Sequence, residues 1–169
     1  RGDSDEGGKR IWWEDTKGNK GLPEGIKVAD LGLYRMDEIK GADEIVLVEG
    51  ATCTDALKEK SVSGVGTICG ASVRPSDDAL RPLVQSDRIV LWPDNDDAGR
   101  KHMTDIGRRL QHLGAINLYM VNWADAPEKG DCADAIDQVV DVGILIAEAE
   151  PIPPPPPQLA KLLDDLVQY

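Results

Sequence analysis

The sequence predicts an α/β fold in which a parallel sheet of about four strands carries helices on both faces. Between residues 41 and 150, short apolar runs rich in β-branched residues alternate four times with segments of helical pattern. The joins between them are short, as expected when consecutive strands and helices pack side by side. Ligands of such sheets collect beyond the carboxyl ends of the strands, so the residues that follow each strand deserve the closest inspection.

The predicted strands and helices follow from local composition. The run at 44–48 has the apolar, β-branched character of a buried parallel strand, and 64–69, 88–92 and 115–121 are read in the same way. Helices are expected at 54–60, at 76–84 with Ser76 as N-cap, at 97–113 and at 131–139. The helix at 97–113 is the best supported, because apolar residues recur at three-to-four spacing and Gly114 provides a stop.

Both ends of the chain differ in composition from this middle segment. Residues 1–9 are rich in Gly and Asp and are expected to be disordered, and residues 10–40 read as an extension with a short strand at 10–14 and a helix or turn at 33–39. Residues 151–157 form a stiff polyproline linker. Residues 158–169 predict an amphipathic helix, which either contacts a further domain or partner or folds back onto the domain.

Charge limits the functions open to this chain. The net charge is −12, and residues 41–150 carry 20 acidic and 10 basic side chains. Phosphate affinity comes from Lys and Arg, so this segment can act on nucleic acid only with metal ions or a basic neighbour; otherwise it is simply an acidic domain. Cys53, Cys69 and Cys132 are widely spaced, which favours a reduced, cytoplasmic setting and disfavours a disulfide framework or a structural zinc site. No membrane span or signal peptide is visible.

Carboxylates follow three of the predicted strands. Glu49 follows the first, Asp94 and Asp96 follow the third, and Asp131 and Asp134 lie in the loop after the fourth. Because parallel strands end at one edge of a sheet, these side chains should gather, and their mutual repulsion would be relieved by a hard cation such as Mg²⁺ or Mn²⁺. The alternative for Asp96 or Asp97 is a helix N-cap with no further role. An EF-hand is excluded because Ala98 occupies a ligand position and a strand precedes the loop.

A strand ending in Glu-Gly, followed 45 residues later by a strand ending in Asp-x-Asp, resembles the Toprim family. The matching stretches are 45–50 and 89–99, and the segment 129–136 is similar to the third acidic element of primase-helicases. The segments 21–25 and 33–39 resemble the approach to this domain in phage and plasmid replication proteins. The resemblance covers roughly residues 10–140 and implies a Rossmann-like Toprim sheet.

The resemblance also implies a chemistry. It assigns metal-dependent nucleotidyl transfer by a DNA primase or primase-helicase, which makes RNA primers from nucleoside triphosphates on single-stranded DNA in a bacterial, archaeal or phage-infected cell. Glu49 would be an acid/base or metal ligand, and Asp94, Asp96 and Asp131 would hold Mg²⁺ or Mn²⁺. The expected supporting residues are Asp97 and Asp134 around the metal and Arg74, Arg100 and Lys101 at phosphates.

Two features depart from the family's pattern. Many members carry an acidic residue four positions after the first Glu, where this chain has Cys53, so Asp55 would substitute or the role would be absent. This chain also lacks a basic template-binding region, so an adjoining helicase or basic domain would be its partner. A metal-dependent nuclease of the same fold and a metal-binding scaffold without enzymatic activity therefore stay open as alternatives.

Overall fold

The computed structural model describes residues 2–3, 9–10, 13–14, 16–68 and 70–155. Its centre is a five-stranded sheet in the order β4-β3-β5-β6-β7. The strands are β3 (Glu44–Glu49), β4 (Gly64–Thr67), β5 (Arg88–Leu91), β6 (Leu118–Met120) and β7 (Glu150–Pro151). The first four are mutually parallel and β7 runs antiparallel to β6, so the predicted parallel sheet is confirmed and gains one short antiparallel strand.

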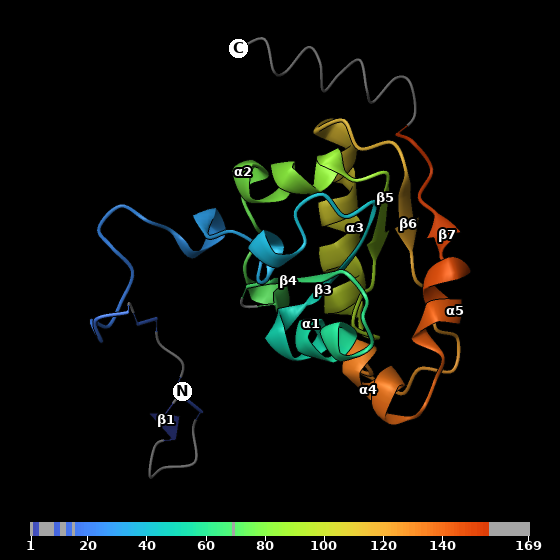
Figure 1. Cartoon of the computed structure of the whole chain (residues 1–169), viewed down its shortest axis with the longest axis horizontal. Helices are drawn as coiled ribbons and strands as arrows, with labels where there is room; N and C mark the ends of the chain where they lie inside the picture. Colours follow the sequence, from blue (N-terminus) through green and yellow to red (C-terminus); the bar gives the residue numbers. More distant parts are fainter. Residues whose placement is uncertain (1, 4–8, 11–12, 15, 69, 156–169) are drawn as a thin grey trace.

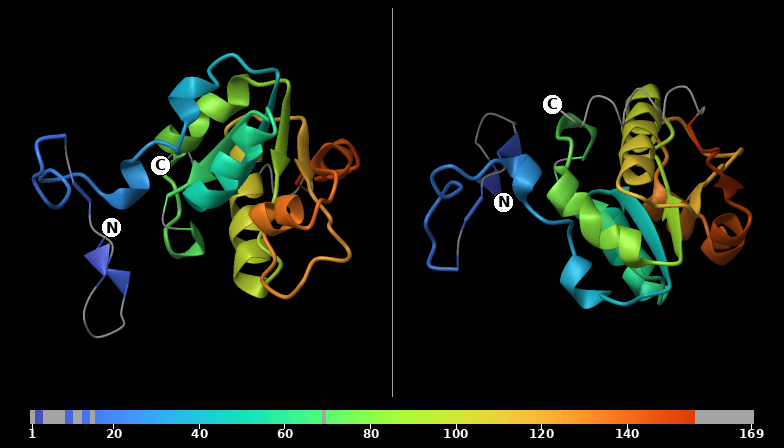
Figure 2. Two further views of the ribbon diagram at one scale, coloured as in Figure 1. Left: turned by 60° about the horizontal axis from the view of Figure 1, so that its bottom comes forward. Right: turned by 90° about the horizontal axis from the view of Figure 1, so that it is seen from above.

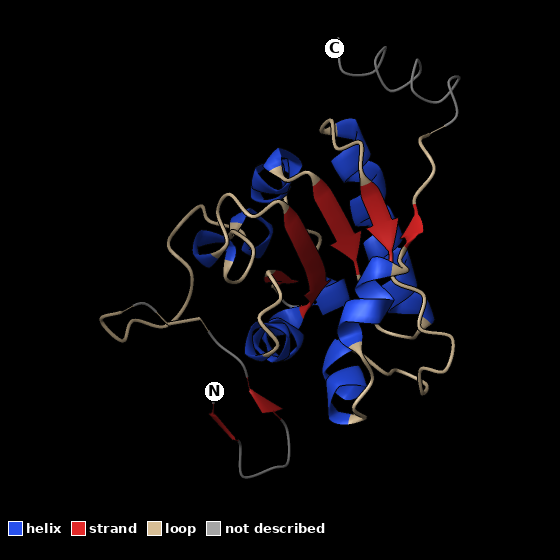
Figure 3. Cartoon of the chain, turned by 45° about the vertical axis from the view of Figure 1, so that its right-hand side comes forward, coloured by secondary structure: helices blue, strands red, loops and turns tan. Residues whose placement is uncertain are grey.

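Helices cover both faces of this sheet, as predicted (Figure 1, Figure 3). The helices are α1 (Gly50–Glu59), α2 (Asp77–Leu80), α3 (Asp97–His112), α4 (Cys132–Asp137) and α5 (Val142–Ala147). Short 3₁₀ turns add η1 (Val28–Asp30), η2 (Met36–Glu38), η3 (Gly70–Ser72) and η4 (Arg81–Gln85).

Alternation along the central strands divides the core into two layers. Ile45 and Leu47 of β3 pack with Met103, Ile106 and Leu110 of α3 on one face. Their neighbours Val46 and Val48 point to the other face, toward residues of α1, α4 and α5. Successive side chains of a strand point to opposite faces, so a strand buried on both sides reads as one continuous apolar run.

The limits of several elements differ from the sequence predictions. The helix predicted at 76–84 is capped by Ser76 but gives way to η4 after Leu80, because Pro82 lacks the N–H that an α-helix needs. The helix predicted at 54–60 begins earlier, at Gly50, and β6 is shorter than the expected 115–121. The segment 33–39 contributes only η2.

The two ends of the chain differ in part from the strand, linker and helix that were predicted for them. Residues 16–27 run outside the sheet (Figure 1, Figure 2), whereas η1 lies against α2, where the Ser76 N–H donates to the Ala29 carbonyl at 2.7 Å. In place of one strand at 10–14, a two-residue strand β2 (Lys9–Arg10) pairs with β1 (Gly2–Asp3), and residues 11–12 lie outside the described part. The predicted linker begins inside the sheet, because Pro151 belongs to β7 and the Ile152 N–H donates to the Leu118 carbonyl at 2.8 Å. The amphipathic helix at 158–169 lies outside the described residues.

Candidate active site

The strands that were expected to deliver carboxylates end at one edge of the sheet (Figure 3). Glu49 is the last residue of β3, Asp94 lies three residues beyond β5, and Asp131 lies in the connection that follows β6. At the turn after Glu49, Gly50 has a φ of +78°, a left-handed conformation that favours glycine. The chain can therefore change there from strand to helix without a linker.

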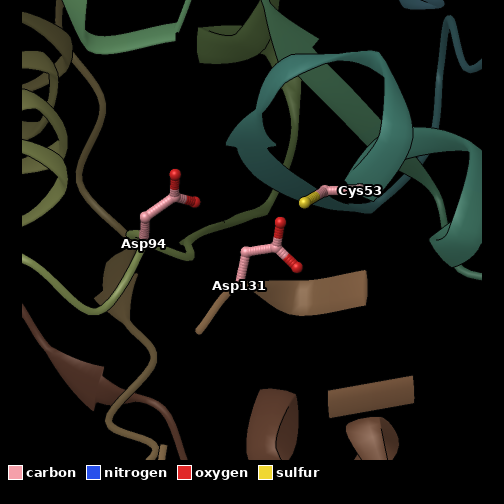
Figure 4. A group of neighbouring side chains, drawn as sticks. All are labelled: Cys53, Asp94 and Asp131. Carbon is pink, nitrogen blue, oxygen red and sulfur yellow. The ribbon is translucent and has the colours of Figure 1, made fainter. Parts of the chain in front are cut away.

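Asp94 and Asp131 meet a thiol rather than a third carboxylate. One ligand atom from each of Cys53, Asp94 and Asp131 lies within 4.8 Å of the other two. The three side chains come from α1, from the loop after β5 and from the N-cap of α4 (Figure 4). The packing of α1 against α4 thus brings together Cys53 and Asp131, which are 78 positions apart in the sequence.

Glu49 lies beside this group and is only 9% exposed. Its Oε1 atom is buried and has no hydrogen-bond partner. A Cβ atom on Gly99 would lie 2.8 Å from that Oε1 and 2.9 Å from the Cβ of Asp94, so only glycine leaves room for both acids beneath α3. Burial raises the pKa of Glu49, although the backbone N–H groups of Asp94 and Ala71 donate to its carboxylate and oppose the rise.

Among the carboxylates of this group, the pKa of Asp94 is the most strongly shifted. Burial raises its pKa to about 7, and the charges of Glu49 and Asp131 add to the rise. No Lys or Arg forms an ion pair with Glu49, Asp94, Asp96 or Asp131 in the described part of the chain. None of these four carboxylates is therefore neutralised by an ion pair within that part.

Two of the acids also have a structural role. Asp96 is the N-cap of α3, and its Oδ1 accepts from the Gly99 N–H at 2.7 Å. Asp131 and Asp134 form a capping box at the start of α4, with reciprocal distances of 2.9 and 3.0 Å. Capping occupies one oxygen of Asp96 and one of Asp131, and it fixes the directions of both side chains.

Asn95, which the sequence did not single out, holds the loop 122–130 next to Asp94. Its Nδ2 donates to the carbonyls of Ala126 and Pro127, both at 2.9 Å, and its backbone N–H donates to the Gly130 carbonyl at 2.8 Å. Asn95 therefore fixes the approach to Asp131. Its position between two aspartates in the sequence was the available signal.

A cavity of about 130 Å³ opens beside Asp94. It is lined by Asn95, Arg100, Trp92 and Trp123, among other residues. Arg100 donates to the Asn95 Oδ1 at 2.8 Å and pairs with Asp97 at 3.0 Å, which holds the guanidinium at the cavity. Of the three predicted phosphate contacts, Arg100 is the one that lies next to the acidic group.

The structure leaves other predicted residues outside the group. Asp55 pairs with Arg35 at 2.6 Å on α1, so it does not replace the acid that Cys53 displaces. Asp97 is fully exposed at the start of α3. Arg74 pairs with Asp105 at 2.9 Å because η3 directs the chain toward α3, and Lys101 is exposed.

Cys53 itself was noted in the sequence only as a departure from a pattern. It lies one helical turn after Glu49, is 2% exposed, and its sulfur accepts from the Ala133 N–H. Burial raises the pKa of the thiol to about 12, so the thiol stays protonated unless a cation displaces its proton. Its four-residue spacing from Glu49 was the signal that could have placed it in the site.

The residues at this edge fit a divalent cation. Carboxylate oxygens converge without an ion pair to Lys or Arg in the described residues, and one buried oxygen lacks any donor. The pKa of Asp94 is raised by burial and, to a smaller extent, by the charges of its neighbours. Each of these features is relieved by positive charge placed among the acids. The arrangement can therefore bind a metal ion and present it to a ligand at the cavity.

No family model matches the sequence, and no curated protein does. Among solved structures, the zinc-binding and RNA polymerase domains of the Aquifex aeolicus primase superpose with a TM-score of 0.63 at 21% identity, covering 86% of this chain and 36% of that one. The E. coli primase catalytic core gives 0.61 at 14% identity, covering 98% and 60%. The fold is that of a Toprim primase core.

A third likeness comes from bacteriophage T7, in a structure of the lagging-strand DNA polymerase interacting with primase domains of two gp4 subunits bound to an RNA/DNA hybrid and dTTP. It has a TM-score of 0.58 at 21% identity and covers 83% of this chain and 71% of that chain. The chain spans only about a third of the length of the Aquifex fragment. In the described residues, no helix is both long and apolar enough to cross a membrane.

Proposed function

We propose that this chain is the catalytic Toprim domain of a DNA primase or primase-helicase, which joins nucleoside triphosphates into RNA primers on single-stranded DNA. The observation that carries the proposal is the edge where Glu49, Asp94, Asp96 and Asp131 gather without an ion pair to Lys or Arg in the described residues. The likeness to primase cores supports it, since this edge ends the parallel strands, where ligands of such sheets bind.

Glu49, Asp94 and Asp96 would hold Mg²⁺ or Mn²⁺, with Asp131 completing the set. A bound divalent ion would neutralise phosphate charge and stabilise the leaving oxygen. Glu49 has a second role open to it, because its raised pKa and its oxygen without a donor suit the acceptance of a proton from an attacking hydroxyl. Arg100, at the cavity beside Asp94, would contact the triphosphate.

The excess of acidic side chains implies that a basic partner would bind the DNA template. Residues 41–150 carry twice as many acidic as basic side chains, so template binding would come from an adjoining basic or helicase domain. The domain would then supply the reaction centre within a larger replication assembly.

The test is primer synthesis by this chain, alone and joined to a basic template-binding domain, with single-stranded DNA, labelled NTPs and Mn²⁺ or Mg²⁺. Labelled oligoribonucleotides are expected from the active form, and the double change Asp94→Asn/Asp96→Asn should abolish them. Asparagine retains the helix cap at 96, so a loss cannot be blamed on α3. Asp78→Asn, at the start of α2 and 94% exposed, removes a carboxylate outside the site; it is the matched control and should leave synthesis unchanged.

Other outcomes separate the alternatives. Shortened DNA in place of primers would assign a nuclease of the same fold. Neither product, even with the joined domain and with divalent binding intact, would favour a metal-binding scaffold. Primer synthesis by the Asp94→Asn/Asp96→Asn form would contradict the proposed site.

A further inference from the structure

Two groups of different chemistry lie near Asp94. The charges of Glu49 and Asp96 act on Asp94, and their oxygen ligands suit Mg²⁺ or Mn²⁺. One ligand atom from each of Cys53 and Asp131 lies within 4.8 Å of a carboxylate oxygen of Asp94. Thiolate ligands shift the preference of a site from hard ions such as Mg²⁺ toward zinc and related thiophilic ions.

We propose that Cys53, Asp94 and Asp131 bind a thiophilic divalent cation of the zinc class. The proposal rests on the proposed function only in placing Asp94 at a metal site, and it does not require primer synthesis. It assigns a ligand role to Cys53, the residue that occupies the position of an expected acid. One thiolate and two carboxylates would carry three negative charges, one more than a divalent ion neutralises.

The spacing of the three ligand atoms suits a single ion. Zinc binds sulfur at about 2.3 Å and carboxylate oxygen at about 2.1 Å, so two such ligands can be no farther apart than about 4.4 Å. Two ligands of a tetrahedral zinc ion lie about 3.5 Å apart, so the observed limit of 4.8 Å needs a contraction of up to roughly 1.3 Å, which side-chain rotation supplies. Three protein ligands leave a fourth position of a tetrahedral site open for water or substrate.

The surroundings hold these ligands in place. The Ala133 N–H donates to the Cys53 sulfur, and the capping box with Asp134 orients Asp131. Supporting hydrogen bonds of this kind direct the ligands of established metal sites. Cation binding would release the thiol proton to solvent, leaving the sulfur as an anion.

A second observation at Asp94 points independently to a ligand. Glu49 is nine-tenths buried, its Oε1 lacks any hydrogen-bond donor, and that atom lies close to Asp94 beside Gly99. Buried polar atoms are rarely left unpaired unless an ion or water completes them. The contrasting interpretation is that Cys53 is only a small apolar core residue, which is the usual role of a buried cysteine.

Cys132 provides the matched control for Cys53. It is 1% exposed, it packs in the same apolar layer, and it does not belong to the ligand group found among the described residues. Its replacement by serine therefore reproduces the loss of a buried sulfur without removing a proposed ligand. Both variants retain Cys69.

The experiment is a titration of the 169-residue chain with Co²⁺, a spectroscopic substitute for Zn²⁺, with a phosphine reductant in place of a thiol. A thiolate-to-cobalt charge-transfer band should appear in the unchanged protein and in Cys132→Ser, and Zn²⁺ should displace it. The band should vanish in Cys53→Ser, and Zn²⁺ affinity should fall at least about tenfold. Cys53→Asp should instead raise the affinity for Mg²⁺ relative to Zn²⁺.

The outcomes separate this inference from the proposed function. A band that persists in Cys53→Ser, or Mn²⁺ binding that depends on Asp94 without any cobalt band, overturns the thiol site and leaves the proposed function intact. The absence of all divalent binding overturns both. Circular dichroism checks folding, and if Cys53→Ser does not fold, Asp131→Asn keeps the helix cap while weakening a ligand and should lower Co²⁺ affinity about tenfold.

Discussion

The two ends of the parallel strands differ in how their charged side chains are paired. At the edge where the parallel strands begin, Arg88 pairs with Glu44, donates to the Ile146 carbonyl at 2.8 Å and lies 4.4 Å above the Tyr119 ring. At the edge where they end, Glu49 and Asp94 are buried beside other acids with no cationic partner in the described residues. One edge satisfies its charges within the protein, and the other accumulates negative charge.

This difference separates structural charge from functional charge. A paired and hydrogen-bonded group stabilises the fold and needs nothing from outside. Buried carboxylates that repel each other lower stability until a cation arrives, so their presence favours a binding role over a structural one.

The largest effect is expected when the space above the acids is filled. Gly99→Ala would press a methyl group against the Asp94 carbonyl and the Glu49 Oε1, so Mn²⁺ affinity should fall at least about tenfold and stability by roughly 1–3 kcal/mol. Gly107→Ala, on the same helix, meets only the side chains of Leu91 and Ile152 and should change stability by less than about 1 kcal/mol. Calorimetric titration and urea unfolding measure both; equal effects on Mn²⁺ binding would contradict a cradle at Gly99.

The next effect concerns pH. Since the pKa of Asp94 is raised to about 7, the native state holds this proton more tightly than the unfolded chain does. Without divalent ions, the free energy of unfolding should therefore fall as pH rises from about 4 to about 7. Asp94→Asn should be more stable than the parent at pH 8 by roughly 2 kcal/mol, and saturating Mn²⁺ should reverse that order. Urea unfolding across this pH range tests the prediction. A free energy of unfolding that does not change with pH would contradict a raised pKa at Asp94.

A smaller effect is expected at the opposite edge. Arg88→Met removes an ion pair, a hydrogen bond to Ile146 and a ring contact, so the free energy of unfolding should fall by roughly 1–2 kcal/mol. Mn²⁺ affinity should stay within about twofold, because no Arg88 contact reaches the acidic edge. A large loss of Mn²⁺ binding would show that the two edges are coupled.

The smallest effect is expected for Asp55. Its side chain is about half exposed and pairs with Arg35, so Asp55→Asn should cost less than about 1 kcal/mol. Metal binding should be unchanged, as measured by the same calorimetric titration. A tenfold weakening would return Asp55 to the site as the replacement for the missing acid.

The sequence predicted the central fold because the local signals agreed with the final packing. The runs that became β3 and β5 are apolar throughout, as strands buried on both faces must be, and the spacing of Met103, Ile106 and Leu110 describes the buried face of α3. It did not predict α5 or β7. Both are short, and β7 contains a proline, so only pairing with β6 gives it strand character.

The candidate site, too, contains residues that could be predicted from the sequence and residues that could not. Glu49, Asp94 and Asp131 could be placed near one another because the ends of parallel strands converge. The four-residue spacing could place Cys53 near Glu49. Its approach to Asp131 could not be predicted, because it depends on how α1 packs against α4, and a sequence pattern does not specify the contact between two helices. Arg74 does follow β4, as expected, but after the turn η3 it pairs with Asp105 and does not join the acidic group.

The prolines after β7 also control how the sheet ends. The Ile152 N–H points inward to Leu118, so the alternation of a strand places the backbone nitrogens of residues 151 and 153 on the outer side, and both residues are prolines. The outer rim therefore offers no donor at either position to an incoming strand. At the far rim, Tyr34 exchanges hydrogen bonds with Gly66 of β4. With both rims closed to lateral growth, the sheet is protected against strand-by-strand self-association.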